Sequence, residues 1–321
     1  MDTTSHRQAD RPLVSIIIVV WNAQKVVLET LDSLQQFLGV TSAEIIAVDN
    51  ASTDGTPDVI ARDYPHVKLI RNGGNFGFAR ANNIGIQHST GKYLAFVNSD
   101  VIFIENSFAP MLQYMDTHPD IGMLGPKMLD PARLVARSTM RFPTVWNTLS
   151  RALALDTLFK GVRFFEGHLM LDFDHNETTD VDVLAGWFWL VRRSALEKVG
   201  MLDESFFMYG EDVDWCYRFR QAGERVVFFA ETKAVHIGGA SSSVAPVRFS
   251  VEKQRATWQV FKKHFGPAKR FGLLLTEVLH NATRAVSYGL LYLVKPADRA
   301  ESLLKCRRSI ACLGWLLRAG F

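Results

Sequence analysis

Apolar positions in the first hundred residues form short continuous runs, separated by segments in which apolar residues recur every three or four positions. The runs predict strands and the periodic segments predict helices. We expect strands at 14–20, 44–48, 67–70 and 93–97, and helices near 25–37, 56–63 and 78–88. Strands buried on both faces are typical of parallel sheets, so this alternation indicates an α/β fold with a helix-covered sheet.

Polar residues follow each expected strand at its carboxyl end. The segments are "WN", "DNASTDGT", "NGGNFGFARANN" and "NSD", in chain order. Each alone could be an ordinary turn or helix cap, and none matches a dinucleotide fingerprint or a P-loop. Ligands of open parallel sheets bind beyond the carboxyl ends of the strands, so four such segments at one edge predict a binding site.

Composition narrows the class of protein. The chain has 321 residues, of which 48% are apolar and 21% charged, as in ordinary globular proteins. Residues 1–13 lack the apolar segment of a signal peptide, and the run "LVSIIIVV" is too short to cross a membrane. Cys216, Cys306 and Cys312 form no paired motif that would indicate disulfides or zinc. We therefore expect a cytoplasmic protein.

The net charge of +3 is unevenly divided. Residues 248–321 contain 14 Lys and Arg against 4 Asp and Glu, a net charge of +10, which leaves −7 for residues 1–247. The apolar runs within 271–294 and 302–320 are broken by polar residues and are too short for membrane-spanning helices. We expect helices that lie on an anionic membrane surface. Packing on the rest of the chain or on a second subunit, in a homo-oligomer, is the alternative.

Six segments resemble, in order and spacing, the family 2 glycosyltransferases of the GT-A fold, and specifically the rhamnosyltransferase-like branch. They are "VSIIIVVWN", "IIAVDNASTDGT", "NGGNFGFARANNIGI", "YLAFVNSD", "LAGWFWLVRRSALEKVGMLDESFFMYGEDVDWCYRFRQAG" and "AVHIGGAS". The resemblance implies a GT-A catalytic domain at 13–243, with a nucleotide-binding half at about 13–100 and an acceptor half at about 101–243. A polar tail, 1–12, would precede it and a basic helical region, 244–321, would follow it.

The resemblance implies an inverting transfer of a sugar from a nucleotide diphosphate to an acceptor hydroxyl. In this branch the expected donor is dTDP-rhamnose and the acceptor a cell-envelope glycan or a polyprenyl-linked glycan, with no nucleic acid involved. Segment 144–180 matches no pattern and is a candidate acceptor loop. By similarity, the residues expected to bind the nucleotide sugar are Trp21, Asn22, Asp49, Asn75, Gly77, Arg80, Asn82, Asn98, Ser99 and Asp100.

A metal site is expected at the fourth strand end. In the family this strand ends in a D-x-D motif whose last Asp binds a divalent ion, and Asn98-Ser99-Asp100 occupies that position here. Mg²⁺ or Mn²⁺ is the expected cofactor, because such ions accept one or two protein oxygens together with substrate phosphates. His236 is the candidate second ligand. Asp100 as a helix cap and His236 as a structural residue are the alternatives.

The general base is expected in "YGEDVDWCYRFRQAG". A helix near 210–222 would place Asp212 on the apolar face with Trp215, Cys216 and Phe219, where burial raises the pKa of a carboxyl towards that of a base. The same wheel directs Glu211 and Asp214 elsewhere, with Arg218 as a surface partner of Asp214. Asp212 as a first-turn acid favoured by the helix dipole is the alternative.

Acceptor contacts are expected from Gly186, Trp187 and Glu211. Trp187 could stack on a sugar ring or belong to a plain buried strand. Two other functions remain open. A sugar-nucleotide pyrophosphorylase would carry a Gly-rich basic signature after the first strand, where this chain has Trp21-Asn22-Ala23, and a non-catalytic glycan-binding module would lack the base.

Overall fold

The computed structural model describes residues 11–238 and 245–318. The chain forms two compact units, and each is made of separate stretches of sequence. Unit 1 comprises Met1–Met140, Asp174–Phe207 and Glu211–Ser241, and unit 2 comprises Arg141–Phe173, Met208–Gly210 and Ser242–Phe321.

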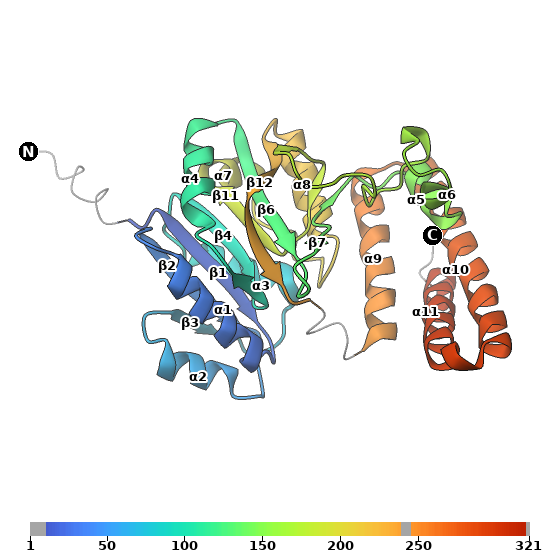
Figure 1. The fold of residues 1–321 in the computed structure, drawn as a ribbon, viewed down its shortest axis with the longest axis horizontal. Helices are drawn as coiled ribbons and strands as arrows, with labels where there is room; N and C mark the ends of the chain where they lie inside the picture. Colours follow the sequence, from blue (N-terminus) through green and yellow to red (C-terminus); the bar gives the residue numbers. More distant parts are fainter. Residues whose placement is uncertain (1–10, 239–244, 319–321) are drawn as a thin grey trace, which may run out of the picture. The chain divides into compact units, whose positions relative to one another are not determined.

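Unit 1 is built on one mixed, largely parallel sheet (Figure 1). Its strands follow the spatial order β3-β2-β1-β4-β11-β6-β12-β5, with β7 paired to β6 and β9 to β12, while β8 and β10 form a separate pair. The strands are β1 Val14–Val20, β2 Ala43–Asp49, β3 Lys68–Arg71, β4 Tyr93–Asn98, β5 Val101–Phe103, β6 Ile121–Leu129, β7 Val135–Ala136, β8 Thr139–Met140, β9 Thr179–Asp180, β10 Val183–Leu184, β11 Phe188–Arg192 and β12 Arg225–His236.

The first four strands confirm the predicted parallel core. β1 pairs in parallel with β2 and with β4, so that Val20 lies opposite Asp49 and Val19 lies opposite Asn98. β1 is buried along almost its whole length, as expected for a strand covered on both faces. The polar segments after these strands therefore meet at one edge of the sheet.

Helices cover both faces of this sheet. Val14, Ile16 and Ile18 share a core with apolar residues of α1, α2 and α4. On the other face Gly85 of α3 lies against Ile17, and Trp215 of α8 lies edge-on to Phe96. The helices of unit 1 are α1 Gln24–Phe37, α2 Thr56–Asp63, α3 Gly77–Gln87, α4 Phe108–Thr117, α7 Arg193–Val199 and α8 Glu211–Gln221.

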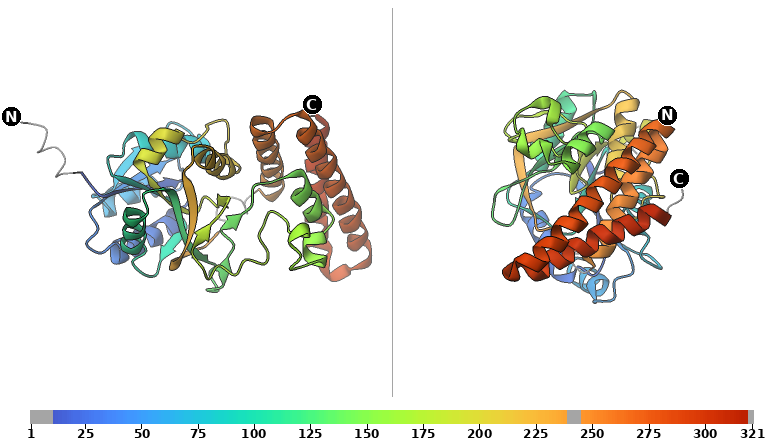
Figure 2. Two further views of the ribbon diagram at one scale, coloured as in Figure 1. Left: turned by 90° about the horizontal axis from the view of Figure 1, so that it is seen from above. Right: turned by 90° about the vertical axis from the view of Figure 1, so that its right-hand side faces the viewer.

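Unit 2 is helical, and α10 is its central element. α10 packs against both α11 and α5, and it forms a hairpin with α11 (Figure 2). Residues 141–173, which include most of the candidate acceptor loop expected at 144–180, group with these helices and contain helices of their own, whereas residues 174–180 belong to unit 1. The helices are α5 Val145–Ala152, α6 Leu155–Leu158, η1 Arg163–Phe165, α9 Pro246–His264, α10 Pro267–Val294, η2 Pro296–Asp298 and α11 Arg299–Arg318. In the described part of the chain, no helix combines the length and the apolar character needed to cross a bilayer.

Candidate active site

The loops after β1 and β2 are locked to each other at the carboxyl edge of the sheet. Asn22, in a left-handed conformation with φ of 46°, accepts a hydrogen bond at its Oδ1 from the Thr53 backbone N at 2.7 Å. Its own backbone N donates to Ser52 Oγ at 2.9 Å. The buried Asp49 carboxylate accepts from the Ser52 N at 3.2 and 3.3 Å. Asp49 and Asn22 are thus held in place before any ligand binds.

The loop after β3 joins the same network through Asn50. Asn50 Nδ2 donates to the Gly77 carbonyl at 3.1 Å, and Asn50 Oδ1 accepts from Asn72 Nδ2 at 2.8 Å. Gly77 has φ of 81°, and its backbone N donates to Asn75 Oδ1 at 3.0 Å. A Cβ at Gly77 would lie 2.3 Å from the Phe207 carbonyl oxygen. Only glycine fits this position, since both the dihedral angle and the space exclude a side chain.

Two expected donor residues have protein partners in the structure. The Arg80 guanidinium is exposed, lies 4.2 Å from the centre of the Phe76 ring and is 3.8 Å from the Glu204 carboxylate. Asn82 is buried and donates to the Phe78 carbonyl at 3.0 Å. The structure thus gives Asn82 a bond within α3, and it leaves the Arg80 side chain accessible at the surface.

Asp100 and His236 meet at the end of β4, as the sequence suggested. His236 Nε2 lies 3.2 Å from Asp100 Oδ1. Asp100 Oδ2 accepts a hydrogen bond from the Gly238 backbone N at 3.1 Å, and Gly238 has φ of 73°. The Ser99 carbonyl accepts from Thr30 Oγ1 at 2.9 Å, which ties the same turn to α1.

Trp187 contacts this pair directly. Its ring stacks on the His236 ring with centroids 4.5 Å apart and an interplanar angle of 20°. Its carbonyl accepts from the Asn98 backbone N at 2.9 Å. Neighbouring Gly186 lies close to Trp189 and Phe78, where a Cβ would approach ring atoms at 3.3 and 3.6 Å. Trp187 therefore fixes the orientation of the imidazole, and the tip of β4 with it.

The Asp100 and His236 pair suits a divalent ion. Two ligands at right angles with bonds of about 2.1 Å are about 3 Å apart, close to the observed separation of the carboxylate oxygen and the imidazole nitrogen. Across residues 11–238 and 245–318, no group of three or more His, Cys, Asp or Glu side chains could hold a metal. An ion at this pair would need its remaining ligands from phosphate oxygens and water, which Mg²⁺ accepts readily.

The burial of the acidic side chains at the start of α8 differs from what the helical wheel predicts. Glu211 and Asp214 are buried, whereas Asp212 is only partly buried. Asp214 is fully buried and accepts from Arg218 Nε at 2.9 Å, and Arg218 also donates to the carbonyls of Val199 and Met201. The expected pairing of Asp214 with Arg218 is therefore present, but the pair is buried, and the expectation that Asp212 rather than Glu211 or Asp214 lies on the buried face is wrong. Asp212 instead keeps access to solvent at the first turn of α8.

The Glu211 carboxyl, at the start of this turn, has a strongly raised pKa. Burial raises its pKa well above the ordinary value, and the neighbouring Asp212 carboxylate raises it further. Glu211 Oε2 has no hydrogen-bond partner among the described residues. Burial therefore favours the protonated form of Glu211, while Asp212 Oδ1 accepts a bond from the Val213 backbone N at 2.8 Å.

The packing of α8 on the sheet sets where these acids lie. Trp215 contacts Phe96 of β4 at 5.3 Å and Trp189 of β11 at 5.5 Å between ring centroids, and its Nε1 donates to the Gly200 carbonyl at 2.9 Å. Cys216 Sγ lies 3.8 Å from the Met123 sulfur of β6. α8 is thus anchored on β4, which ends at Asn98, and on β11, which begins directly after Trp187.

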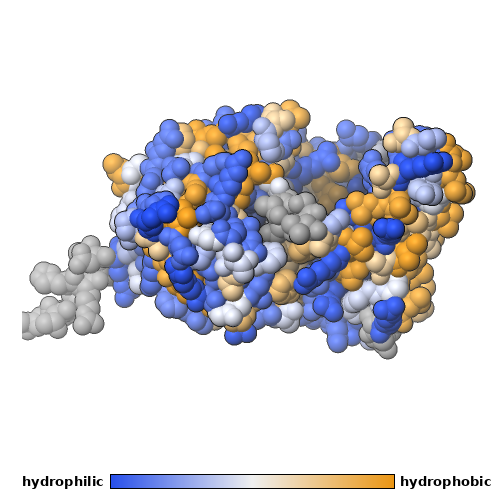
Figure 3. Space-filling view, turned by 90° about the horizontal axis from the view of Figure 1, so that it is seen from below, coloured by the Kyte–Doolittle hydropathy of each residue, from blue (hydrophilic) through white to orange (hydrophobic). Residues whose placement is uncertain are grey.

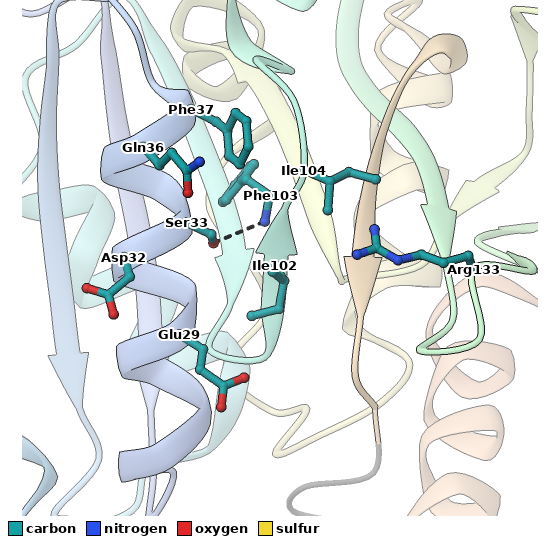
Figure 4. Close-up of a pocket in the computed structure, with 9 residues that line it drawn as sticks. All are labelled: Glu29, Asp32, Ser33, Gln36, Phe37, Ile102, Phe103, Ile104 and Arg133. Carbon is teal, nitrogen blue, oxygen red and sulfur yellow. Dashed lines mark hydrogen bonds between the residues drawn. The ribbon is translucent and has the colours of Figure 1, made fainter.

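A separate groove lies outside this set of residues. It has a volume of about 560 Å³ and runs between α1 and β5, with Arg133 at its far side (Figure 4). Ser33 Oγ accepts from the Phe103 backbone N at 3.1 Å, so α1 covers this edge of the sheet. None of the residues predicted for the site lines the groove.

Sequence reasoning missed three residues that shape the site. Gly238 binds the Asp100 carboxylate, Asn50 joins the second and third loops, and the Phe207 carbonyl accepts from the Phe78 backbone N at 2.8 Å. The signal for two of them was present, since Gly238 lies within "HIGGAS" and Asn50 within "DNASTDGT". Phe207 acts only through its backbone and leaves no signal in the sequence.

Comparison with known proteins identifies the family. The sequence model described as glycosyl transferase family 2 matches residues 15–200. The chain is 28% identical over 242 residues to an N-acetylglucosaminyl-diphospho-decaprenol L-rhamnosyltransferase of Mycobacterium tuberculosis, covering 70% of this chain and 78% of that protein. It is also 28% identical over 240 residues to the dTDP-rhamnosyl transferase RfbF of Shigella flexneri, covering 73% of each.

Solved structures share the fold. A mannosyltransferase from Pyrobaculum calidifontis, in complex with GDP-Man and Mn²⁺, superposes with a TM-score of 0.58 at 17% identity, covering 97% of this chain and 88% of that chain. GalNAc-T7 with UDP, GalNAc and Mn²⁺ superposes with a TM-score of 0.54 at 15% identity, covering 80% of this chain and 52% of that one. Together with the ordered loops at the carboxyl edge of the sheet, these matches show that the chain is a glycosyltransferase with the GT-A fold and belongs to glycosyl transferase family 2.

Proposed function

We propose that this protein is an inverting rhamnosyltransferase. It would transfer rhamnose from dTDP-rhamnose to a hydroxyl of a cell-envelope glycan or a polyprenyl-linked acceptor. Two relatives named for rhamnosyl transfer support the donor, and one of them is named for a decaprenol-linked acceptor. The observation that carries the proposal is the Asp100 and His236 pair, 3.2 Å apart at the edge where the donor loops end.

The donor would bind along the edge formed by the first three loops. The Asp49 carboxylate, held by the Ser52 backbone N, would accept hydrogen bonds from the base or the ribose of the nucleotide. Arg80, accessible at the surface of α3, would reach a phosphate after leaving Glu204. The neighbouring residues Trp21, Asn22, Asn75, Gly77 and Asn82 would shape the loops around the nucleotide.

Asp100 and His236 would hold Mg²⁺ or Mn²⁺ together with the diphosphate. When bound, such an ion supplies positive charge to the leaving nucleotide diphosphate. Asn98 and Ser99 belong to the turn that carries Asp100. Stacking on the Trp187 ring holds the His236 imidazole in one orientation. The residues of the protein thus position the diphosphate at the tip of β4.

Asp212 would act as the general base. Its carboxylate would take the proton of the acceptor hydroxyl while the hydroxyl oxygen attacks the anomeric carbon. The bond between that carbon and the diphosphate oxygen breaks in the same step, and the nucleotide diphosphate leaves with the bonding electron pair. The configuration inverts because no covalent intermediate with the enzyme forms. Glu211, whose protonated form burial favours, would donate a hydrogen bond to the acceptor, next to Gly186 and Trp187.

A panel of nucleotide sugars would test this proposal. Full-length protein is incubated with each donor, Mn²⁺ and a membrane extract that contains lipid-linked glycans, and the released nucleotide diphosphate is measured. We expect dTDP release from dTDP-rhamnose, with an inverted linkage in the product by NMR. Pyrophosphate-dependent formation of a nucleoside triphosphate would instead indicate a pyrophosphorylase, and donor binding without turnover a glycan-binding module. Asp212→Asn is the matched inactive control.

We also propose that the enzyme acts in the cytoplasm and associates peripherally with the membrane through unit 2. Exposed apolar residues form a stripe along α10, about 33 Å long at 1.5 Å per residue. The stripe consists of Phe271, Leu275, Leu279, Val286, Leu290 and Leu293. Hydrophobic residues also occupy much of the surface of unit 2 in Figure 3, on the right of the view. This association would bring the site to a polyprenyl-linked acceptor.

A further inference from the structure

A second apolar surface of unit 2 runs from the end of α6 to the start of η1, over residues 157–164. All eight residues of the 157–164 segment are exposed, and half of them are large apolar side chains. Leu158 is 73% exposed, Phe159 42%, Val162 47% and Phe164 65%. Such a concentration of exposed apolar side chains in one short segment marks a contact surface.

The 157–164 segment has a defined conformation that holds these side chains outward. Trp146 Nε1 donates to the Phe164 carbonyl at 2.6 Å, and the two rings lie 4.8 Å apart. Phe159 stacks on Phe165 at 4.6 Å with an interplanar angle of 27°. Gly161, with φ of 84°, makes the turn, and its backbone N donates to Asp172 Oδ2 at 3.0 Å. The apolar side chains are thus presented by a pre-formed turn.

The charges of this segment are all positive. Lys160 and Arg163 are exposed between the apolar residues, and residues 157–165 contain no acid. The two flanking acids are engaged elsewhere: Asp156 is buried and bound to Arg151, and Glu166 is bound to Arg141. The exposed Asp172 has one oxygen occupied by the Gly161 backbone N. An anionic surface would therefore meet two cations and four apolar side chains.

We propose that the 157–164 segment inserts into the head-group region of an anionic bilayer. Aromatic and aliphatic side chains enter the interface between head groups and acyl chains, while Lys and Arg contact anionic phosphates. Phe159 and Phe164 would enter beside Leu158 and Val162, and the Trp146 ring behind Phe164 suits the interfacial layer. A protein partner would need a groove that is both acidic and apolar and that matches the segment in shape. An anionic bilayer offers negative charge and an apolar interior without such a groove.

This inference rests on the membrane contact proposed above and names a second element that makes it. The α10 stripe alone provides apolar area, and the 157–164 segment adds cations placed among its apolar side chains. α5 packs against α10, so truncating the C-terminal helices would expose a buried face of α5. Point variants of the full-length chain are therefore the appropriate test.

Sedimentation with vesicles tests the apolar contribution. Full-length protein is mixed with vesicles of phosphatidylglycerol and phosphatidylcholine, or of phosphatidylcholine alone. We expect binding to the anionic vesicles that weakens with added salt, and a loss of at least about tenfold in partitioning for Leu158→Ser/Phe164→Ser. Val40→Ser is the matched control, because Val40 is a fully exposed apolar residue of unit 1, and it should bind like the wild type.

A second variant, which reverses the charge of two residues, keeps the test decisive if the serine variant misfolds. Lys160→Glu/Arg163→Glu changes exposed cations only, and it should reduce binding to anionic vesicles by about tenfold or more. Arg62→Glu, on the exposed face of α2 in unit 1, is its control and should leave binding unchanged. Circular dichroism and thermal unfolding of each variant should match the wild type.

Quenching by brominated lipids tests insertion directly. We expect quenching of tryptophan fluorescence on vesicle binding, and a loss of most of that quenching in Trp146→Phe. If the wild-type protein binds neither the anionic nor the neutral vesicles, both this inference and the proposed membrane contact are overturned. Wild-type binding that survives both changes in the 157–164 segment would overturn this inference alone and leave the α10 stripe as the contact.

Discussion

Replacement of Gly77 by alanine should uncouple the donor loops from the turn that precedes α8. Gly77 has φ of 81°, and a Cβ there would lie 2.3 Å from the Phe207 carbonyl oxygen and 2.8 Å from its ring. The same carbonyl accepts the Phe78 backbone N at 2.8 Å, and Phe207 lies just ahead of Glu211 in the sequence. The new methyl group can be accommodated only by moving backbone.

The cost has two parts. A non-glycine residue in the left-handed region loses about 1–2 kcal/mol. Displacement of the Phe207 carbonyl leaves the Phe78 N without its partner, which costs about 1–3 kcal/mol for a buried donor. We therefore expect Gly77→Ala to lower the free energy of unfolding by about 3 kcal/mol, a substantial share of the 5–15 kcal/mol of an ordinary domain.

Urea unfolding followed by circular dichroism measures this loss, and initial rates at varied donor concentration measure its effect on catalysis. We expect a higher donor KM and a lower kcat together, because Asn50 bonds to the Gly77 carbonyl. Gly73→Ala is the control in the same loop, since a Cβ there meets nothing within 4 Å and φ is not positive. A Gly77→Ala protein as stable and active as Gly73→Ala would refute the reasoning.

Four further changes test the site and its surroundings. Asp100→Asn should abolish transfer and make donor binding, measured by calorimetry, insensitive to Mg²⁺ or Mn²⁺; retained activity in chelator would contradict the metal site. Asp212→Asn should lower kcat by about 10²- to 10⁴-fold with donor affinity unchanged, and a larger loss in Glu211→Gln would show that the base is the other acid. The raised pKa of Glu211 means that the folded protein keeps a proton that the unfolded chain releases above about pH 4.5. Stability therefore falls as pH rises from there towards the raised pKa, and Glu211→Gln should gain stability over the wild type by urea unfolding at about pH 8 but not at about pH 4. Asp214→Ala should cost about 3–5 kcal/mol in the same assay, because it leaves the Arg218 guanidinium without its buried partner; a neutral effect would mean that the carbonyls of Val199 and Met201 suffice.

The sequence predicted the sheet and the edge where the site lies, because parallel strands such as β1 and β4 carry an uninterrupted apolar signal. It misplaced the acids of α8 for a geometric reason. A helical wheel gives the direction in which a side chain points from the helix axis. It does not show which turns of the helix the neighbouring elements cover. At the first turn the packing that buries Trp215 leaves Asp212 partly open, while Arg218 and the loop after α7 cover Asp214.

Long-range contacts carried no local signal at all. The hydrogen bond from the Gly238 backbone N to Asp100 joins residues 138 positions apart, and no hydrophobic periodicity in the sequence predicts it. The grouping of residues 141–173 with the C-terminal helices depends on how α5 packs against α10, which single-sequence patterns do not encode. The irregular segment that gave no readable pattern therefore became part of a helical unit.

The separation of Asp100 from its partners along the chain has a consequence for synthesis. Ribosomes produce the protein from its N-terminus, so the β4 turn emerges long before His236 and Gly238. During that interval the nascent chain lacks the imidazole nitrogen and the backbone donor that hold the Asp100 carboxylate in place. A translation product that stops before residue 236 would have the donor loops but not the assembled carboxylate and imidazole pair. Under the proposed function, in which this pair holds the metal and the diphosphate, such truncated chains would not turn over the sugar nucleotide.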